Sequence, residues 1–267
     1  MNKSVSVIFF VALAYCTTIS LYAQSPYRTS WEKDGPILGI GCASSAVGLA
    51  LYESVSSPTA MDISQLSSGS VNWFDRSATS HYSESAASAS NVLFAIAAAA
   101  PLALFTDATV RDDWRPIMLM YVETWSFIGG TSTLSKGLIE RYRPYVYNPD
   151  VSMDKKLTSD AKKSFFSNHT TTAFASAVFL STVYGDYHPD SEWRPYIWAG
   201  SLLMASVVGY LRYEAGEHYP TDILTGAAVG SAIGYIIPWM HRSDKETVSV
   251  TPGVPHADYG FSIHMKF

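Results

Sequence analysis

The stretch Arg212-Tyr213-Glu214-Ala215-Gly216-Glu217-His218-Tyr219-Pro220-Thr221-Asp222 joins two uncharged segments in the C-terminal third of the chain. It sets Arg212, His218 and Asp222 at fixed spacing. Pro220 suits the first turn of a helix, where a missing N–H costs no helical bond. His218 then lies just before that helix, close enough for Asp222 to fix one ring nitrogen and leave the other free. By themselves, a capping aspartate and an exposed histidine are equally compatible with this spacing.

Two more clusters precede this stretch. Lys136 and Arg143 lie near the end of a predicted helix over 114–142, which Pro144 would stop, and their spacing of two turns places both on one face. Two ordinary cations at a helix C-terminus would give the same pattern, because the helix dipole favours them there.

The other cluster, Ser167-Asn168-His169, opens a predicted helix. A helix N-terminus attracts anions, and Ser167 suits an N-cap or a phosphate ligand. Alone, such a histidine is more often structural. However, helix-length segments separate the three clusters, so all three can meet at one end of a bundle. Cations, two histidines and a carboxylate together suit phosphoryl transfer.

The rest of the chain predicts an all-α fold, a bundle of about six core helices that is associated with a membrane and ends in a short C-terminal β-hairpin. Ala, Gly and Ser recur along the apolar segments, as in closely packed membrane helices. Alternation within 247–267, broken by Pro and Gly, favours the hairpin. The predicted helices cover 36–53, 91–105, 114–142, 167–184, 196–213 and 222–240.

The predicted organisation has four parts: a signal peptide (1–23), an N-terminal helix with a polar surface segment (24–88), a helical core (89–242) and a tail (243–267). Lys3, a short apolar run and the exit at Ala23 are typical of an export signal cleaved after Ala23. The run is about ten residues long, and a bilayer span needs roughly 20. Cleavage leaves Cys42 as the remaining cysteine, which we expect to be buried.

Composition limits the partners. Charged residues make up 15% of the chain and the net charge is −5, so we expect no nucleic-acid partner. Apolar segments of helical length predict membrane association. Loop charges would place the site in the cytoplasm, and so would a cleaved signal followed by a span over 36–53, whereas a first segment that lies along the surface or packs against the bundle would place the site outside. We expect a protein of the bacterial cell envelope with its site facing the periplasm. The sequence leaves the oligomeric state and the number of spans open.

Together, the clusters resemble the type 2 phosphatidic acid phosphatase family, which shares its fold with vanadium haloperoxidases and class A bacterial acid phosphatases. That family has the pattern K-x6-RP, PSGH and SR-x5-H-x3-D. The resemblance covers about residues 90–240, including the helix order. The matching residues are Lys136, Arg143, Pro144, Ser167, His169, Arg212, His218 and Asp222.

The resemblance implies a role for each matching residue. His218 would be the nucleophile that forms a phosphohistidine, Asp222 would orient it, and His169 would serve as acid and then base. The phosphoryl oxygens would be held by Lys136, Arg143, Ser167, Asn168 and Arg212. No metal or cofactor would be needed. Three positions depart from the pattern: Phe166, Asn168 and Leu211.

The expected function is hydrolysis of a lipid phosphate monoester or diphosphate at the membrane. Apolar helices beside a cationic site motivate this, with four lysines (Lys155, Lys156, Lys162 and Lys163) available for anionic headgroups. The alternatives are a soluble periplasmic acid phosphatase of broad specificity, a vanadate-dependent haloperoxidase, and an inactive envelope protein. Release without detergent would indicate the first, and bromide oxidation with added vanadate the second.

Overall fold

The computed structural model describes residues 25–243, 249–254 and 257–264. This part of the chain is mostly helical, which confirms the predicted helical class. The predicted signal peptide lies outside the described residues. The long helices are α2 (Trp31–Ser54), α4 (Glu84–Ala99), α6 (Trp114–Ile139), α8 (Asn168–Tyr187), α9 (Arg194–Glu214) and α10 (Pro220–His241).

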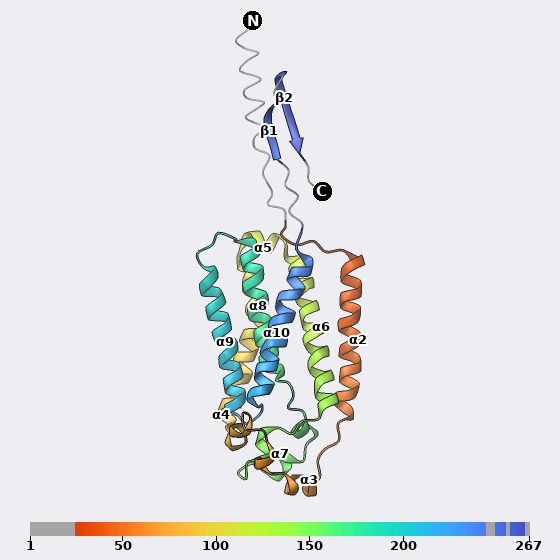
Figure 1. Ribbon diagram of the computed structural model, residues 1–267, viewed down its shortest axis with the longest axis vertical. Helices are drawn as coiled ribbons and strands as arrows, with labels where there is room; N and C mark the ends of the chain where they lie inside the picture. The colour runs from red at the N-terminus through yellow and green to blue at the C-terminus, as the bar shows by residue number, and fades with distance from the viewer. Residues whose placement is uncertain (1–24, 244–248, 255–256, 265–267) are drawn as a thin grey trace.

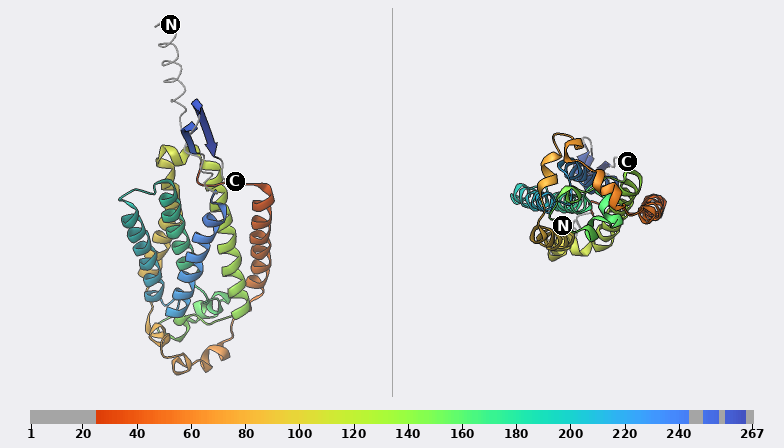
Figure 2. Two further views of the ribbon diagram at one scale, coloured as in Figure 1. Left: turned by 45° about the horizontal axis from the view of Figure 1, so that its top comes forward. Right: turned by 90° about the horizontal axis from the view of Figure 1, so that it is seen from below.

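The long helices run side by side, and short elements cover one end of the bundle (Figure 1, Figure 2). At that end lie α3 (Ala60–Gln65), η1 (Ser68–Ser70), η2 (Arg76–Ser80), η4 (Pro144–Tyr147), α7 (Met153–Lys156) and η5 (Ser159–Lys162). The opposite end holds η3 (Ala100–Thr106) and α5 (Ala108–Asp112). Residues 25–28 also lie there beside the end of α10, where Arg28 N–H donates to the His241 carbonyl at 2.8 Å.

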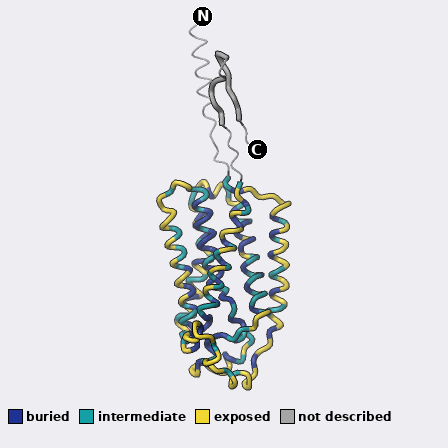
Figure 3. Tube along the Cα trace, viewed as in Figure 1, coloured by how far each residue is buried: buried dark blue, intermediate teal, exposed yellow. Residues whose placement is uncertain are grey.

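Helix α8 is the central element, buried along most of its length (Figure 3). Its closest partner is α10, and small residues allow this approach. A methyl group at Gly230 would lie 2.2 Å from the Thr171 carbonyl oxygen, and one at Gly234 would lie 2.3 Å from that of Ala175. Glycines four residues apart therefore bring α10 against the α8 backbone, which sets the start of α10 beside the start of α8.

The outer surface of the bundle is apolar. Among the described residues, α2, α4 with η3, and α10 are long and apolar enough to cross a membrane. Large side chains such as Val47 on α2, Leu203 on α9 and Ile236 on α10 point away from the core. Cys42 is exposed on this surface rather than buried, because α2 packs only one side against the bundle.

The third predicted helix is shorter than expected. Helix α6 ends at Ile139, and Glu140 adopts a left-handed conformation with φ 43° that turns the chain. Arg143 is consequently not on the helix; it has extended backbone and precedes η4. The expectation that helical periodicity places Lys136 and Arg143 on one face is wrong, and a loop brings them together instead.

Two strands lie near the C-terminus. β1 (Ser249–Val254) pairs antiparallel with β2 (Ala257–His264), and Val250 lies opposite Ile263. Residues 255–256 between the strands lie outside the described part, so the hairpin as a whole stays a prediction.

Candidate active site

The covered end of the bundle collects the predicted site residues. They come from elements that are far apart in sequence: the last turns of α6 and α9, the first turns of α8 and α10, and the connecting loops. Lys136 is in α6, Arg143 precedes η4, Ser167 caps α8, Asn168 and His169 begin α8, Arg212 ends α9, His218 precedes α10, and Asp222 lies in its first turn.

The loop before α10 is shaped by a glycine. Gly216 has φ 68°, and a Cβ there would lie 2.2 Å from the His81 carbonyl oxygen. Only glycine fits both constraints. The Glu217 and His218 amides then turn back to the Arg212 carbonyl, at 3.1 and 3.3 Å. This turn points both side chains toward the end of α9.

Asp222 is fixed by several donors. Its Oδ2 accepts from Ser164 Oγ at 2.6 Å and from the Tyr219 amide at 3.0 Å, and its Oδ1 accepts from Arg141 Nη1 at 2.5 Å. His218 Nδ1 lies 3.6 Å from Oδ2. The separation is longer than a hydrogen bond, so the predicted contact that fixes one ring nitrogen is approached in this geometry but not closed.

His218 is 1% exposed, and its Nε2 lies 3.4 Å from Arg143 Nη1. Burial lowers the pKa of His218 well below its ordinary value, and the charges of Arg143 and Lys136 lower it further. The imidazole is therefore neutral near pH 7. Neutral imidazole has a free electron pair, which a nucleophile requires.

Arg143 is held by the carboxylates and the backbone carbonyls of Asp160 and Glu217. It donates to Asp160 Oδ1 at 2.8 Å, to the Asp160 carbonyl at 2.9 Å and to Glu217 Oε2 at 2.7 Å. Burial disfavours the charge, but Asp160 and Glu217 outweigh it and raise the pKa of Arg143 above its ordinary value. The guanidinium is thus charged and fixed in orientation beside His218.

Glu217 occupies the space between the cations. Besides Arg143, its Oε2 lies 3.4 Å from Arg212 Nη2, and its Oε1 accepts from Lys155 at 3.2 Å. The carboxylate is 8% exposed. A carboxylate that bridges three cations shows that this cluster of positive charge can hold an anionic group.

His169 lies on the other side of the site. Its Nε2 is 2.9 Å from Asn91 Oδ1, and its ring packs on Phe94 with centroids 4.5 Å apart. Ser167 is fully buried and is the N-cap of α8, because its Oγ accepts from the Thr170 backbone amide at 3.4 Å. The structure thus shows the capping role of Ser167, and its role as a phosphate ligand stays a prediction.

Sequence analysis missed a supporting network. Arg141 joins Asp75 at 2.7 Å to Asp222, and its guanidinium lies 4.0 Å above the Tyr219 ring. Asp75 also accepts from Thr221 Oγ1 at 2.7 Å. Arg141 lies within the Lys136–Pro144 motif, and the sequence leaves open whether it supports the site or faces solvent. Asp75 lies in a polar segment with no recognisable pattern.

The four lysines proposed for headgroups all have partners within the protein. Lys155 binds Glu217, and Lys162 pairs with Glu140. Lys156 is buried and donates to the Asn148 carbonyl at 2.6 Å, and Lys163 stacks over Tyr52 at 3.7 Å. These lysines therefore support the site loops, which removes the main argument for a lysine headgroup clamp.

Comparisons with known proteins point to one superfamily. Residues 117–246 match the profile of the PAP2 superfamily. The chain is 39% identical over 127 residues to a lipid A 1-phosphatase from Porphyromonas gingivalis, a match covering 48% of this chain and 24% of the relative. It is 30% identical over 111 residues to a probable diacylglycerol pyrophosphate phosphatase from Schizosaccharomyces pombe, covering 40% and 38%.

The chain thus aligns with less than half of the length of either relative. A crystal structure of a transmembrane PAP2-type phosphatidylglycerolphosphate phosphatase from Bacillus subtilis aligns with 90% of this chain and 96% of its own, with a TM-score of 0.42 and 18% identity. Residues 117–246, the segment that matches the superfamily profile, contain every residue of the three clusters from Lys136 to Asp222. Residues 117–246 of this chain belong to the PAP2 superfamily.

Proposed function

We propose that this protein is a membrane-bound phosphatase that hydrolyses a lipid phosphate monoester or diphosphate through a phosphohistidine on His218. One observation carries the proposal: the buried His218 imidazole lies between the Asp222 carboxylate at 3.6 Å and the Arg143 guanidinium at 3.4 Å. The first group orients Nδ1, and the second would attract a phosphoryl oxygen toward Nε2.

The reaction would proceed in two displacements. His218 Nε2 attacks phosphorus and forms an N–P bond, the bond from phosphorus to the leaving oxygen breaks, and His169 protonates that oxygen. His169 then accepts a proton from water, whose oxygen attacks phosphorus, and the N–P bond breaks to release phosphate. Lys136, Arg143 and Arg212 would oppose the charge on the phosphoryl oxygens throughout.

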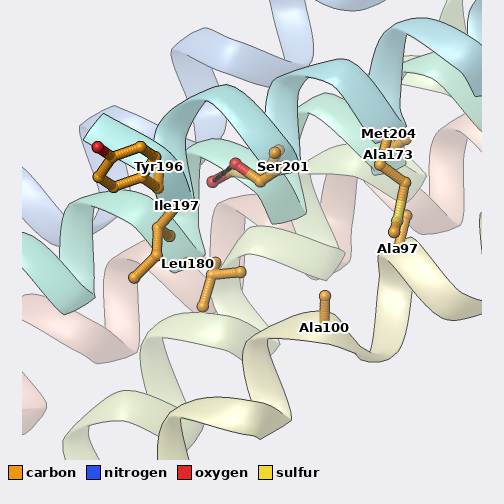
Figure 4. Close-up of a pocket in the computed structure, with 10 residues that line it drawn as sticks. Ala97, Ala100, Ala173, Leu180, Tyr196, Ile197, Ser201 and Met204 are labelled. Atoms are coloured by element: carbon orange, nitrogen blue, oxygen red, sulfur yellow. Dashed lines mark hydrogen bonds between the residues drawn. The ribbon is translucent and has the colours of Figure 1, made fainter. Parts of the chain in front are cut away.

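An apolar pocket supports a lipid substrate. It has a volume of about 260 Å³ and lies between α4, α8 and α9 (Figure 4). Ala173 and Ala97 line it. Ala173 lies about one turn beyond His169 on α8, and Ala97 lies about one turn beyond Phe94 on α4, whose ring packs on His169. An acyl chain attached to a phosphate at His218 could extend into this pocket, which a soluble substrate would leave empty.

The pocket can be tested by filling it. Gly200 lines it, and a Cβ at Gly200 meets nothing within 4 Å, so Gly200→Leu should fold normally. We expect this variant to lose turnover of a long-chain lipid phosphate and to retain turnover of a soluble aryl phosphate. Equal loss on both substrates would argue against an acyl-chain role.

We further propose that the site faces the periplasm. Helix α2 runs along α6 over the depth of the bundle (Figure 1), so residues 25 and 243 lie at the end away from the site. A periplasmic site then requires a cytoplasmic residue 25, which conflicts with cleavage of an export signal after Ala23. Of these two expectations, we retain the periplasmic site.

Single cysteines would test this orientation. In a background with both native cysteines replaced by serine, Ser77→Cys places a thiol at the site end and Glu192→Cys places one at the other end; both positions are exposed. A membrane-impermeant maleimide added to spheroplasts should label position 77 and spare position 192. The reverse pattern would place the site in the cytoplasm.

The activity itself is tested by phosphate release from detergent-purified protein in excess chelator. The substrates are a lipid phosphate, a lipid diphosphate and a soluble aryl phosphate. We expect His218→Ala to abolish release and His188→Ala, a histidine at the opposite end of the bundle, to preserve it. Acid-labile, base-stable phosphate should be trapped on the wild type alone. Activity surviving in His218→Ala would refute the proposed nucleophile.

A further inference from the structure

Three titratable side chains meet at the end of the bundle opposite His218. They are Asp34 in the first turn of α2, Glu123 in α6, and His241, the last residue of α10. Asp34 is 3% exposed, and the other two are fully buried. One possible ligand atom from each lies within 4.8 Å of the other two. The proposed phosphatase chemistry uses none of them.

The histidine is held with a defined tautomer. His241 Nδ1 lies 2.8 Å from the Ile237 carbonyl, which only accepts, so Nδ1 bears a proton. Nε2 faces Asp34 Oδ1 at 2.9 Å and Glu123 Oε2 at 3.3 Å. In neutral imidazole, the Nε2 electron pair would face two carboxylates. Either a proton or a metal cation must therefore lie between Nε2 and the carboxylate oxygens of Asp34 and Glu123.

A proton on Nε2 accounts for only part of the cluster. It would form a hydrogen bond with Asp34, whereas both oxygens of Glu123 have no hydrogen-bond partner among the described residues. Two carboxylates and one imidazolium would also leave a net negative charge in a buried place, which is unfavourable. A divalent cation would engage both carboxylates together with Nε2 and make the cluster neutral.

We propose that Asp34, Glu123 and His241 bind a divalent transition-metal ion, with zinc as the first candidate. Zinc accepts histidine nitrogen and carboxylate oxygen at about 2.0–2.2 Å, so the three atoms need small shifts to surround it. The bond from Nδ1 to a backbone carbonyl is the support that metal-binding histidines generally have. Because the ligands come from three helices, the ion would fasten α2 to α6 and α10.

The test measures metal content and stability rather than catalysis. The full chain, carrying a tag without histidine, is purified in detergent, stripped with chelator, dialysed against zinc and freed of excess metal. We expect about one zinc ion per chain by elemental analysis. We also expect a higher thermal unfolding midpoint than in the stripped protein. Absence of bound zinc and an unchanged midpoint would overturn the proposal.

Variants separate this site from adventitious binding. Glu123→Gln should abolish zinc retention and the zinc-dependent rise in the midpoint. His188→Gln is the control, because His188 also faces a carboxylate, Asp107 at 3.3 Å, but with a single carboxylate partner and greater exposure. It should bind zinc like the wild type. Equal retention by Glu123→Gln and the wild type would place the metal elsewhere and refute the assignment.

A spectroscopic measurement covers the case in which Glu123→Gln does not fold. Cobalt(II) replaces zinc at many such sites and gives visible absorption that depends on its ligands. Cobalt added to the stripped wild type should produce bands that one equivalent of zinc removes. A spectrum identical to that of cobalt in buffer would overturn the proposal without any variant.

Discussion

Glu217 is the residue that most changes the interpretation of the site. Its carboxylate bridges Arg143 and Arg212, two of the three cations proposed to hold the phosphoryl group. It allows these guanidinium groups to lie close together, since their like charges would otherwise repel. A phosphate entering the site must share or displace this carboxylate, so Glu217 should set how tightly the substrate binds.

We therefore expect Glu217→Gln to lower the KM for a phosphate ester by about tenfold. The two arginines would then lack a competing carboxylate, and a hydrogen bond to a charged group contributes about 1.5–3 kcal/mol. The unfolding midpoint should fall without ligand and recover with phosphate. Glu214→Gln is the matched control, since Glu214 pairs with His81 instead. A raised KM would mean that Glu217 positions the arginines rather than competing with the substrate.

The environment of His218 predicts a pH dependence. Burial and neighbouring cations lower the pKa of its imidazole, so the ring stays neutral and nucleophilic as the pH falls below the ordinary histidine value of about 6.5. The fall of kcat/KM at low pH (its acid limb) that comes from protonation of His218, rather than of the substrate, should therefore lie below about pH 6.5. Two substrates whose phosphate pKa values differ would separate the enzyme limb from the substrate limb. A limb at or above 6.5 with both substrates would contradict this prediction.

At the scale of elements, the contact between α8 and α10 aligns the two halves of the site. His169 begins α8 and Asp222 begins α10, so a shift between these helices would separate the acid from the nucleophile. The contact depends on backbone-to-backbone approach along glycines of α10. Helix propensity does not maintain it, because glycine is a poor helix former.

Replacing glycine by alanine should therefore have opposite effects on stability in α10 and in α2. Gly230→Ala should lower both stability and activity, because its Cβ would meet the Thr171 carbonyl at 2.2 Å. Gly39→Ala on α2 meets nothing within 4 Å and should raise stability by up to about 1 kcal/mol. Unfolding midpoints in detergent and kcat measure both effects. A stabilising Gly230→Ala would show that the helices are not closely packed there.

At the scale of the whole molecule, the apolar outer surface predicts how the protein is extracted. Helix α10 has 22 residues, or about 33 Å at 1.5 Å per residue, which matches a hydrocarbon core of about 30 Å. We expect membranes to retain the protein in high salt and in alkaline carbonate and to release it in detergent. Immunoblots of the fractions measure this. Release by salt would favour the soluble periplasmic phosphatase instead.

Local sequence patterns were enough to predict the helical class, the superfamily and the residue types of the candidate site. Apolar periodicity and the spacing of Arg212, His218 and Asp222 are local properties, because they depend on residues within a few turns of one another. Even Pro220 as the start of α10 follows from such local chemistry. The sequence also placed the three clusters at one end of the bundle, because helix-length segments separate them.

The tertiary structure alone decided which charges meet across the bundle. Arg143 reaches His218 from a loop rather than from the helix predicted for it, and Asp75 reaches Arg141 from a segment without a pattern. Likewise, Asp34 and His241 are far apart in the chain and adjacent in space. The physical reason is that pairing between distant side chains depends on how closely the helices pack. That distance is set by small residues along the whole α8–α10 contact, not by any one motif.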